Sequence, residues 1–190
     1  MPTKVIPQKY MYAAFVALGL TFAGEHLSSN SHQGEERWET KVLADDENDS
    51  VIYTPEKTTL HKLVGLETTK SHDGNTRQPV ELKTYKIECH IDDFLYEDDG
   101  DVHLVLKFDT ETMIGEIPFP YYPEAASSGN KTKFIKVRKQ FHKIVDGNKN
   151  YPLKTVIVTG VGFVDFSHGQ TGRAPNNLEL HPILNIELKK

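Results

Sequence analysis

The residues whose types and spacing best suit chemistry lie between positions 166 and 182 (FSHGQTGRAPNNLELHP). A loop that only reverses the chain needs Gly, Pro, Asn or Asp, and Gly169, Gly172 and Pro175 meet that need. The segment also carries polar residues beyond those that the turn requires: His168, Gln170, Arg173, Asn176, Asn177, Glu179 and His181. Polar groups gathered where a loop meets a rigid strand are typical of a binding or catalytic site. The sequence leaves open which of the two it is.

A second group of charged residues begins at the acidic turn of residues 97–100 (EDDG). The carboxylates of Asp98, Asp99 and Asp101 are oxygen ligands of the kind that calcium and magnesium prefer. We expect Asp98 and Asp99 to lie in a solvated hairpin with Gly100 at its turn. Asp101 opens a strand two residues before His103, and alternation places both side chains on the same face.

The elements that must position these residues follow from the hydrophobic periodicity. Alternating or β-branched apolar residues, bounded by turn signals, predict strands. The expected strands cover residues 85–91, 101–108, 113–117, 155–166 and 178–188. In the fourth of these, Gly160 and Gly162 predict a bulge or a sharp bend. Residues 130–145 change to the helical period, with apolar side chains on one side.

The order of these elements is three strands, one helix and two strands (β-β-β-α-β-β). This is the order of a five-stranded Greek-key barrel of the OB type. We therefore predict a mainly β fold, with an OB-like β-barrel domain over residues 79–190. Residues 24–78 are expected to be a spacer and wrapping segment, with a short helix at 58–66 capped by Thr58 or Thr59. The alternative is an α+β sheet with the helix on one face.

The barrel brings the two charged groups together. In an OB barrel the third strand lies between the second and the fifth, so Glu116 stands between the two groups. If Val102, Leu104 and Leu106 fill the barrel, their polar neighbours face outward. Five residues then converge outside one part of the sheet: Asp101, His103, Glu116, Glu179 and His181. Histidine with carboxylate suits zinc or another divalent ion, or a general acid–base pair. The alternative is a set of cross-strand polar pairs on a solvated face.

Composition narrows the classes of function. The 190-residue chain has a formal net charge of −5, which argues against general binding of polyanions. Its single cysteine, Cys89, excludes an internal disulfide. Residues 131–154 nevertheless carry eight Lys or Arg against one acid. Such a run steers a polyanion or, more commonly, is a solvated helix face.

Residues 1–23 have the form of an export signal. Lys4 and Lys9 precede an apolar run over residues 10–23, and polar residues follow directly. The run is shorter than the ~20 residues of a membrane span, so we expect no stable span in the mature chain. The alternative is an ordinary buried N-terminal helix.

Four segments of the chain resemble those of an uncharacterised group of bacterial proteins that often carry export signals. The segments are RWETKVLADD, EDDGDVHLVL, TMIGEIPFP and VTGVGFVDFSHGQTGRAPNNLELHPILNIE. The likeness runs from Arg37 nearly to the end of the chain. It implies a secreted, periplasmic or cell-envelope protein of bacterial origin and supplies no activity.

A shorter segment, DGDVHLVL followed by EIPFP, is similar to one hairpin of staphylococcal-nuclease-like proteins. These are OB-fold, calcium-dependent phosphodiesterases, and the resemblance implies that Asp101 is a metal ligand. The chain departs from the family pattern after the hairpin, because no arginine occurs between Arg77 and Arg138.

Together these features predict an exported, metal-dependent phosphodiesterase or nuclease-like hydrolase. The expected ligands of a divalent ion (Zn, Mg or Ca) are Asp101, His103, Glu179 and His181. The residues assigned to catalysis are His168, Arg173 and Glu116. The residues assigned to binding a nucleic acid, or another phosphate-containing or sugar ligand, are Gln170, Asn176 and Asn177. The alternatives are a non-catalytic OB-like module that binds oligosaccharide, nucleic acid or protein, and a structural envelope protein.

Overall fold

The structure is a computed structural model that describes residues 37–69, 76–146, 155–166 and 169–190. All of these residues belong to one compact unit, Gln33–Lys190. The expected signal peptide (1–23), the first part of the spacer (24–36) and His168 lie outside the described residues.

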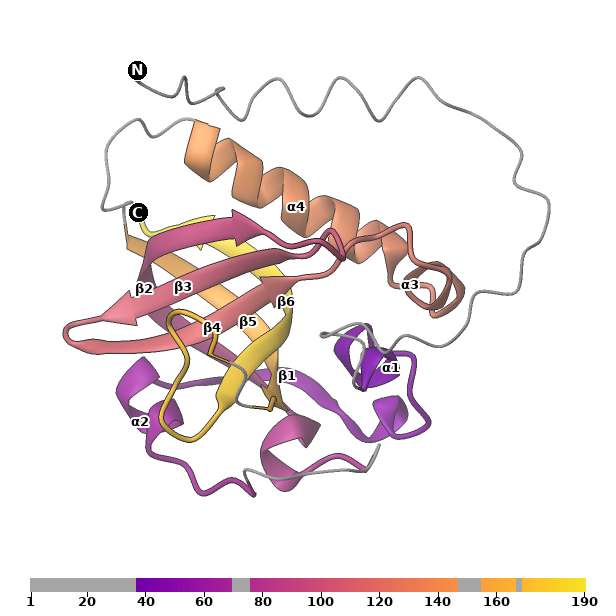
Figure 1. Ribbon diagram of the computed structural model, residues 1–190, viewed down its shortest axis with the longest axis horizontal. Helices are drawn as coiled ribbons and strands as arrows, with labels where there is room; N and C mark the ends of the chain where they lie inside the picture. Colours follow the sequence, from indigo (N-terminus) through magenta and orange to yellow (C-terminus); the bar gives the residue numbers. More distant parts are fainter. Residues whose placement is uncertain (1–36, 70–75, 147–154, 167–168) are drawn as a thin grey trace, which may run out of the picture. The chain divides into compact units, whose positions relative to one another are not determined.

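Six strands form one mixed sheet. They are β1 (Ile52–Lys57), β2 (Lys83–Tyr96), β3 (Val102–Phe108), β4 (Glu111–Ile117), β5 (Thr155–Val164) and β6 (Leu178–Leu188). The order of neighbours is β1-β2-β3-β4-β6-β5, and β2 also pairs with β5. Strands β2 to β6 therefore close a five-stranded barrel (Figure 1). This confirms the predicted mainly β, OB-like barrel and excludes the open α+β sheet.

The barrel closes at a seam between β4 and β6, which run parallel to each other. The two strands share a single register pair, Gly115 with Leu180. The other four pairs of barrel strands are antiparallel and have long ladders. The seam is therefore the part of the barrel with the least backbone pairing.

Four α-helices accompany the barrel within the described residues: α1 (Trp38–Lys41), α2 (Leu60–Val64), α3 (Pro123–Ser127) and α4 (Lys131–Asp146). Helix α2 begins as predicted, because the Thr59 side chain accepts a hydrogen bond from the Lys62 N–H at 3.2 Å. Helix α4 lies between β4 and β5 in the chain and across the barrel in Figure 1. Its Val137, Phe141 and Ile144 join the barrel core. None of these helices is long and apolar enough to cross a membrane.

The apolar phase of β3 is as predicted, whereas that of β6 is only half right. Val102, Leu104 and Leu106 are all fully buried in the core. On β6, strict alternation along residues 178–188 predicts an inward set of Leu178, Leu180, Pro182, Leu184, Ile186 and Leu188. The core instead takes Leu178, Leu180, Ile183 and Ile186. The register with β5 shifts on both sides of Gly160. One bulge therefore moves the inward position to Ile183, and the second restores the alternating phase at Ile186.

The predicted irregularity at Gly160 and Gly162 is confirmed by these register shifts. At Gly162 the reason for glycine is a close approach of the chain. A β-carbon there would lie 2.3 Å from the carbonyl oxygen of Val80 and 3.0 Å from the Tyr85 ring.

Gly162→Ala is therefore expected to lower the free energy of unfolding by about 1–3 kcal/mol, because backbone must move to admit the methyl group. Urea denaturation measures the loss. Gly65→Ala is the matched control, since its β-carbon would have no neighbour closer than 3.6 Å. Equal losses in the two variants would contradict the packing argument.

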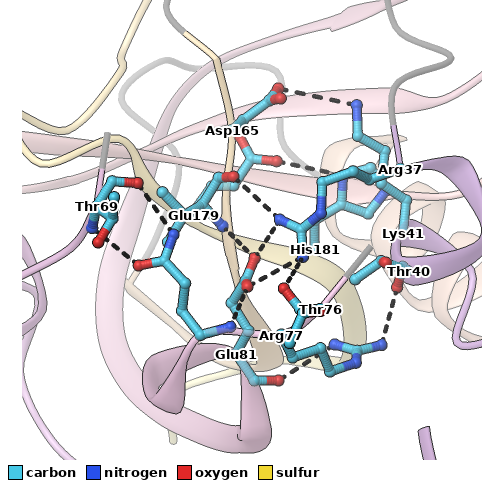
Figure 2. Close-up of polar contacts among 12 residues, drawn as sticks. Arg37, Thr40, Lys41, Thr69, Thr76, Arg77, Glu81, Asp165, Glu179 and His181 are labelled. Atoms are coloured by element: carbon cyan, nitrogen blue, oxygen red, sulfur yellow. Dashed lines mark hydrogen bonds and ion pairs between the residues drawn. The ribbon is translucent and has the colours of Figure 1, made fainter. Parts of the chain in front are cut away.

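The segment before the barrel adds one strand to the sheet and is held by buried ion pairs. Strand β1 lies parallel to β2, and every one of its residues is exposed, which explains why no periodicity predicted it. Arg77 fixes the segment by pairing with Asp45, with Nη2 2.6 Å from Oδ1 and Nε 2.9 Å from Oδ2. Arg37 binds Glu81 in a similar two-bond manner (Figure 2).

Candidate functional site

Five of the predicted site residues meet in one cluster, named here the His–carboxylate cluster: Asp101, His103, Glu116, Glu179 and His181. His103 on β3 is the direct register partner of Glu116 on β4. The next strand, β6, supplies Glu179 and His181, one on each side of the seam residue Leu180.

Glu116 lies between the two histidines of the cluster. Its Oε1 is 3.2 Å from Nδ1 of His103, and its Oε2 is 2.9 Å from Nδ1 of His181. Nδ1 of His181 is also 3.3 Å from Oε1 of Glu179. Each oxygen of one carboxylate therefore binds a different imidazole.

The alternative of polar pairs on a solvated face does not hold, because all five side chains are buried. Their exposed fractions range from 0% for Asp101 and His181 to 4% for Glu116. The loop between β5 and β6 covers one side, where Nε2 of His103 is 3.0 Å from the Thr171 carbonyl oxygen. In the same loop, Gly172 packs so closely on β3 that a β-carbon would lie 2.7 Å from the Val105 side chain.

Helix α1 covers the other side and adds a cation that the sequence analysis did not assign. Nζ of Lys41 is 3.8 Å from Oδ2 of Asp165 and 5.4 Å from the centre of the Phe163 ring. The guanidinium carbon of Arg37 lies 4.8 Å from the centre of the same ring. Figure 2 shows Arg37 and Lys41 reaching from the wrapping segment toward Asp165, Glu179 and His181.

A pocket of about 420 Å³ opens beside the cluster. It is lined by Lys41, Leu95, Tyr96, Glu97, Asp98, Asp99, Glu116, Asp165, Gly169 and Gln170. These residues come mainly from the β2–β3 turn and the β5–β6 loop, the two loops with which OB barrels bind ligands. Glu116 is the one member of the His–carboxylate cluster that lines the pocket. It therefore connects the buried groups to solvent.

The three buried carboxyl groups of the cluster have different pKa values. Burial would raise the pKa of Glu116, but the charge of His181 and hydrogen bonds from both histidines hold it well below its ordinary value. Burial raises the pKa of Glu179 to about 8, and the negative charges of Glu116 and Asp165 add to the rise. Burial likewise raises the pKa of Asp101 to about 7, despite the opposing charge of His181. The surroundings therefore favour the ionised form of Glu116 and the protonated form of Glu179.

Both histidines have a raised pKa. Burial alone would lower it, but hydrogen bonds that His103 donates to Glu116 and Glu97 raise its pKa to about 10. At His181 burial is outweighed by the charge of Glu116 and the hydrogen bonds of Glu116 and Glu179, which raise its pKa to about 10. Without a bound cation, both rings are imidazolium ions at neutral pH.

The remaining predicted residues have separate places. Arg173 is exposed and donates to Oδ1 of Asn177. Nδ2 of Asn176 donates to the carbonyl oxygens of Leu63 and Leu66, at 2.9 and 3.0 Å. These bonds use both amide hydrogens of Asn176 to hold the loop against α2, so they are not available to a substrate.

Gln170 alone of the predicted substrate-binding residues lines the pocket. Its Nε2 lies 3.2 Å from Oδ2 of Asp165. Neither Asp165 nor Lys41 was predicted, because a polar residue at the end of a strand or in a four-residue helix carries no periodic signal.

Two groups of three residues within the described chain bring possible metal ligands together. In each group, one ligand atom per residue lies within 4.8 Å of the others. The first is Glu97, His103 and Glu116, and the second is Asp101, Glu116 and His181. The single set predicted from the sequence is therefore divided in two. Glu97 joins the first group, Glu116, which was assigned to catalysis, joins both, and Glu179 belongs to neither.

No family model matches the chain, and a search of curated protein sequences returned no match. Among solved structures, the fold is similar to one described as "a putative aspartyl-tRNA synthetase from Leishmania major Friedlin". The sequences are 11% identical and the TM-score is 0.42, over 72% of this chain and 21% of that chain. A likeness at this level carries no argument about function.

Proposed function

We propose that this protein is a metal-dependent hydrolase of phosphodiesters, with a divalent cation held by Glu97, His103 and Glu116. We call these three residues the outer site. One observation supports the proposal above the others. Two of the three residues of the outer site, Glu97 and Glu116, line a solvent-open pocket between the two loops where OB barrels bind ligands.

The distances in the outer site fit one ion. Nδ1 of His103 is 3.4 Å from Oε1 of Glu97 and 3.2 Å from Oε1 of Glu116. Ligands of a tetrahedral zinc ion, each about 2.0–2.1 Å from the metal, lie roughly 3.3 Å apart. Nε2 of His103 faces the Thr171 carbonyl oxygen at 3.0 Å. A proton on Nε2 leaves the lone pair on Nδ1, and a metal-bound histidine commonly makes this second contact.

A cation in the outer site would supply Lewis acidity and a water of lowered pKa at neutral pH. The chain's own residues supply the rest of the pocket. Gln170 donates a hydrogen bond to Asp165, and both residues line the pocket. They are therefore suited to orient a polar substrate. Lys41, also on the pocket wall, provides a positive charge for a phosphate oxygen. The two stretches that resemble the nuclease family, residues 99–106 and 116–120, carry His103 and Glu116 of the outer site.

The second candidate is a non-catalytic OB-like binding module. The observation in its favour is the charge of the pocket. Five carboxyl groups line it, from Glu97, Asp98, Asp99, Glu116 and Asp165. Lys41 is the only cation of the described lining, and it is paired with Asp165. A polyanion would therefore be repelled unless a bound cation changes the balance. A neutral sugar would not be repelled by these carboxyl groups.

The first experiment measures the metal content of purified full-length protein and its cleavage of bis(p-nitrophenyl) phosphate and of plasmid DNA. We expect a chelator to abolish cleavage, and Glu97→Gln to reduce it more than a hundredfold with loss of one ion. Glu88→Gln is the matched control, because Glu88 is an exposed residue that pairs with Lys189.

Cleavage that persists in chelator or in Glu97→Gln would contradict the outer site as a catalytic centre. Bound metal without cleavage of either substrate would leave the binding module. The expected export signal at residues 1–23 would place either activity in the periplasm or outside the cell.

A further inference from the structure

Two buried polar atoms of the His–carboxylate cluster have no hydrogen-bond partner: Oδ2 of Asp101 and Nε2 of His181. Both residues are 0% exposed. The two atoms face each other at 3.6 Å, which is longer than a hydrogen bond. Buried polar atoms are almost always paired, so this gap requires an explanation.

The other polar atoms of these two residues are already engaged. Oδ1 of Asp101 accepts a hydrogen bond from the Phe119 N–H at 2.7 Å. Nδ1 of His181 lies 2.9 Å from Glu116 and 3.3 Å from Glu179. Three carboxyl groups thus surround one imidazole ring, which has at most two N–H groups. Two of them share Nδ1, and Asp101 is left unsatisfied.

The width of the gap distinguishes a water molecule from a metal ion. Across 3.6 Å, a water about 2.8 Å from each atom would bond at an angle of roughly 80°, which is too narrow for its geometry. With an ion about 2.0–2.1 Å from each atom, the angle between the two ligand atoms at the ion would be roughly 120°, close to the tetrahedral arrangement of zinc. The separation therefore fits the shorter bonds of a metal ion.

We propose that Asp101 and His181 form a second cation site, the inner site, which takes a zinc-like divalent ion between Oδ2 and Nε2. Glu116 binds Nδ1 on the opposite side of the ring, as the carboxylate partner of a metal-bound histidine does. Neither Asp101 nor His181 lines the pocket. The inner ion is therefore set apart from the pocket, and its presence does not depend on the proposed hydrolase activity.

The test is a zinc titration of metal-stripped full-length protein by equilibrium dialysis. We expect two bound equivalents in the wild type and one fewer in Asp101→Asn. Asp98→Asn, an exposed acid three residues earlier, should retain both. Glu97→Gln should lose only the outer ion, so a failure of the outer site is distinguished from a failure of the inner one. An unchanged stoichiometry in Asp101→Asn would overturn the inner site.

A second measurement needs no variant and guards against misfolding of Asp101→Asn. In the 15N NMR spectrum of the histidine rings, zinc is expected to remove the Nε2 proton of His181 and to leave its Nδ1 proton in place. A His181 ring that keeps both protons at neutral pH in saturating zinc would overturn the proposal.

Discussion

The Glu81→Ala variant is expected to unfold with a free energy about 3–5 kcal/mol below that of the wild type, because it breaks a fully buried ion pair. Glu81 is 0% exposed, and its carboxylate receives Nη1 of Arg37 at 2.7 Å and Nη2 at 3.0 Å. It also accepts the backbone N–H groups of Gln78 at 2.6 Å and Val164 at 2.8 Å. Alanine would leave a guanidinium and two N–H groups buried without this partner.

Urea denaturation with paired variants measures this effect. Glu88→Ala removes the same residue type from an ion pair with Lys189 at 2.6 Å, but the two side chains are 43% and 48% exposed. Its cost is expected to be about 0–1 kcal/mol, because solvent screens the pair. If the two variants lost the same free energy, the buried anchor between the wrapping segment and the barrel would be disproved.

The Glu116→Gln variant is expected to lower the pKa of both cluster histidines in metal-free protein. In the wild type both pKa values are raised to about 10. Glutamine keeps the size of the side chain and removes the charge, while the burial that opposes the imidazolium form remains. NMR titration of the histidine ring signals in a chelator measures the change.

The sign of the pH dependence follows from linkage. A histidine whose folded pKa lies above its unfolded value of about 6.5 stabilises the protein fully below that pH. The contribution is lost as the pH rises toward 10. Glu179, with its pKa raised to about 8, acts in the same direction, because its ionisation opposes folding. The contribution of Glu179 is lost between its unfolded pKa of about 4.3 and about 8. The contribution of the histidines is lost between about 6.5 and 10, and Glu116→Gln should show a smaller fall in that second range.

Glu97→Gln is the matched control for the titration. Within the cluster, Glu97 is 3.4 Å from Nδ1 of His103 and has no ion pair with His181. Only the His103 pKa should move in this variant. A His181 pKa that stays near 10 in Glu116→Gln would show that Glu179 and Asp101 hold its charge, contrary to the pairing described here.

The alternation of leucines was sufficient to predict the barrel and the convergence of charged groups on its outer side. Val102, Leu104 and Leu106 fix the inward face of β3, and the neighbouring His103 must then point outward. The same reasoning placed Glu116 beside it, because the strand order of an OB barrel brings β3, β4 and β6 together.

Periodicity could not predict what covers that face. Lys41 lies in a helix of four residues, which is too short to show a helical pattern. Asp165 lies directly after β5, where polar residues are common in any protein. The shift of Ile183 into the core came from bulges against β5, and no alternating pattern reveals an inserted residue. The roles of Asn176 and Arg173 depend on loop geometry that sequence spacing does not specify.

The sparse pairing between β4 and β6 gives the His–carboxylate cluster a mechanical role. With one register pair at the seam, little of the cohesion between these strands comes from main-chain ladders. Glu116 follows Gly115 on one side, and Glu179 and His181 flank Leu180 on the other, with His181 bonded to Glu116 across the junction. The contact between His181 and Glu116 therefore acts as a non-covalent cross-link between β6 and β4 in the barrel. The free energy needed to separate β4 from β6 therefore depends on the protons and cations that the cluster binds.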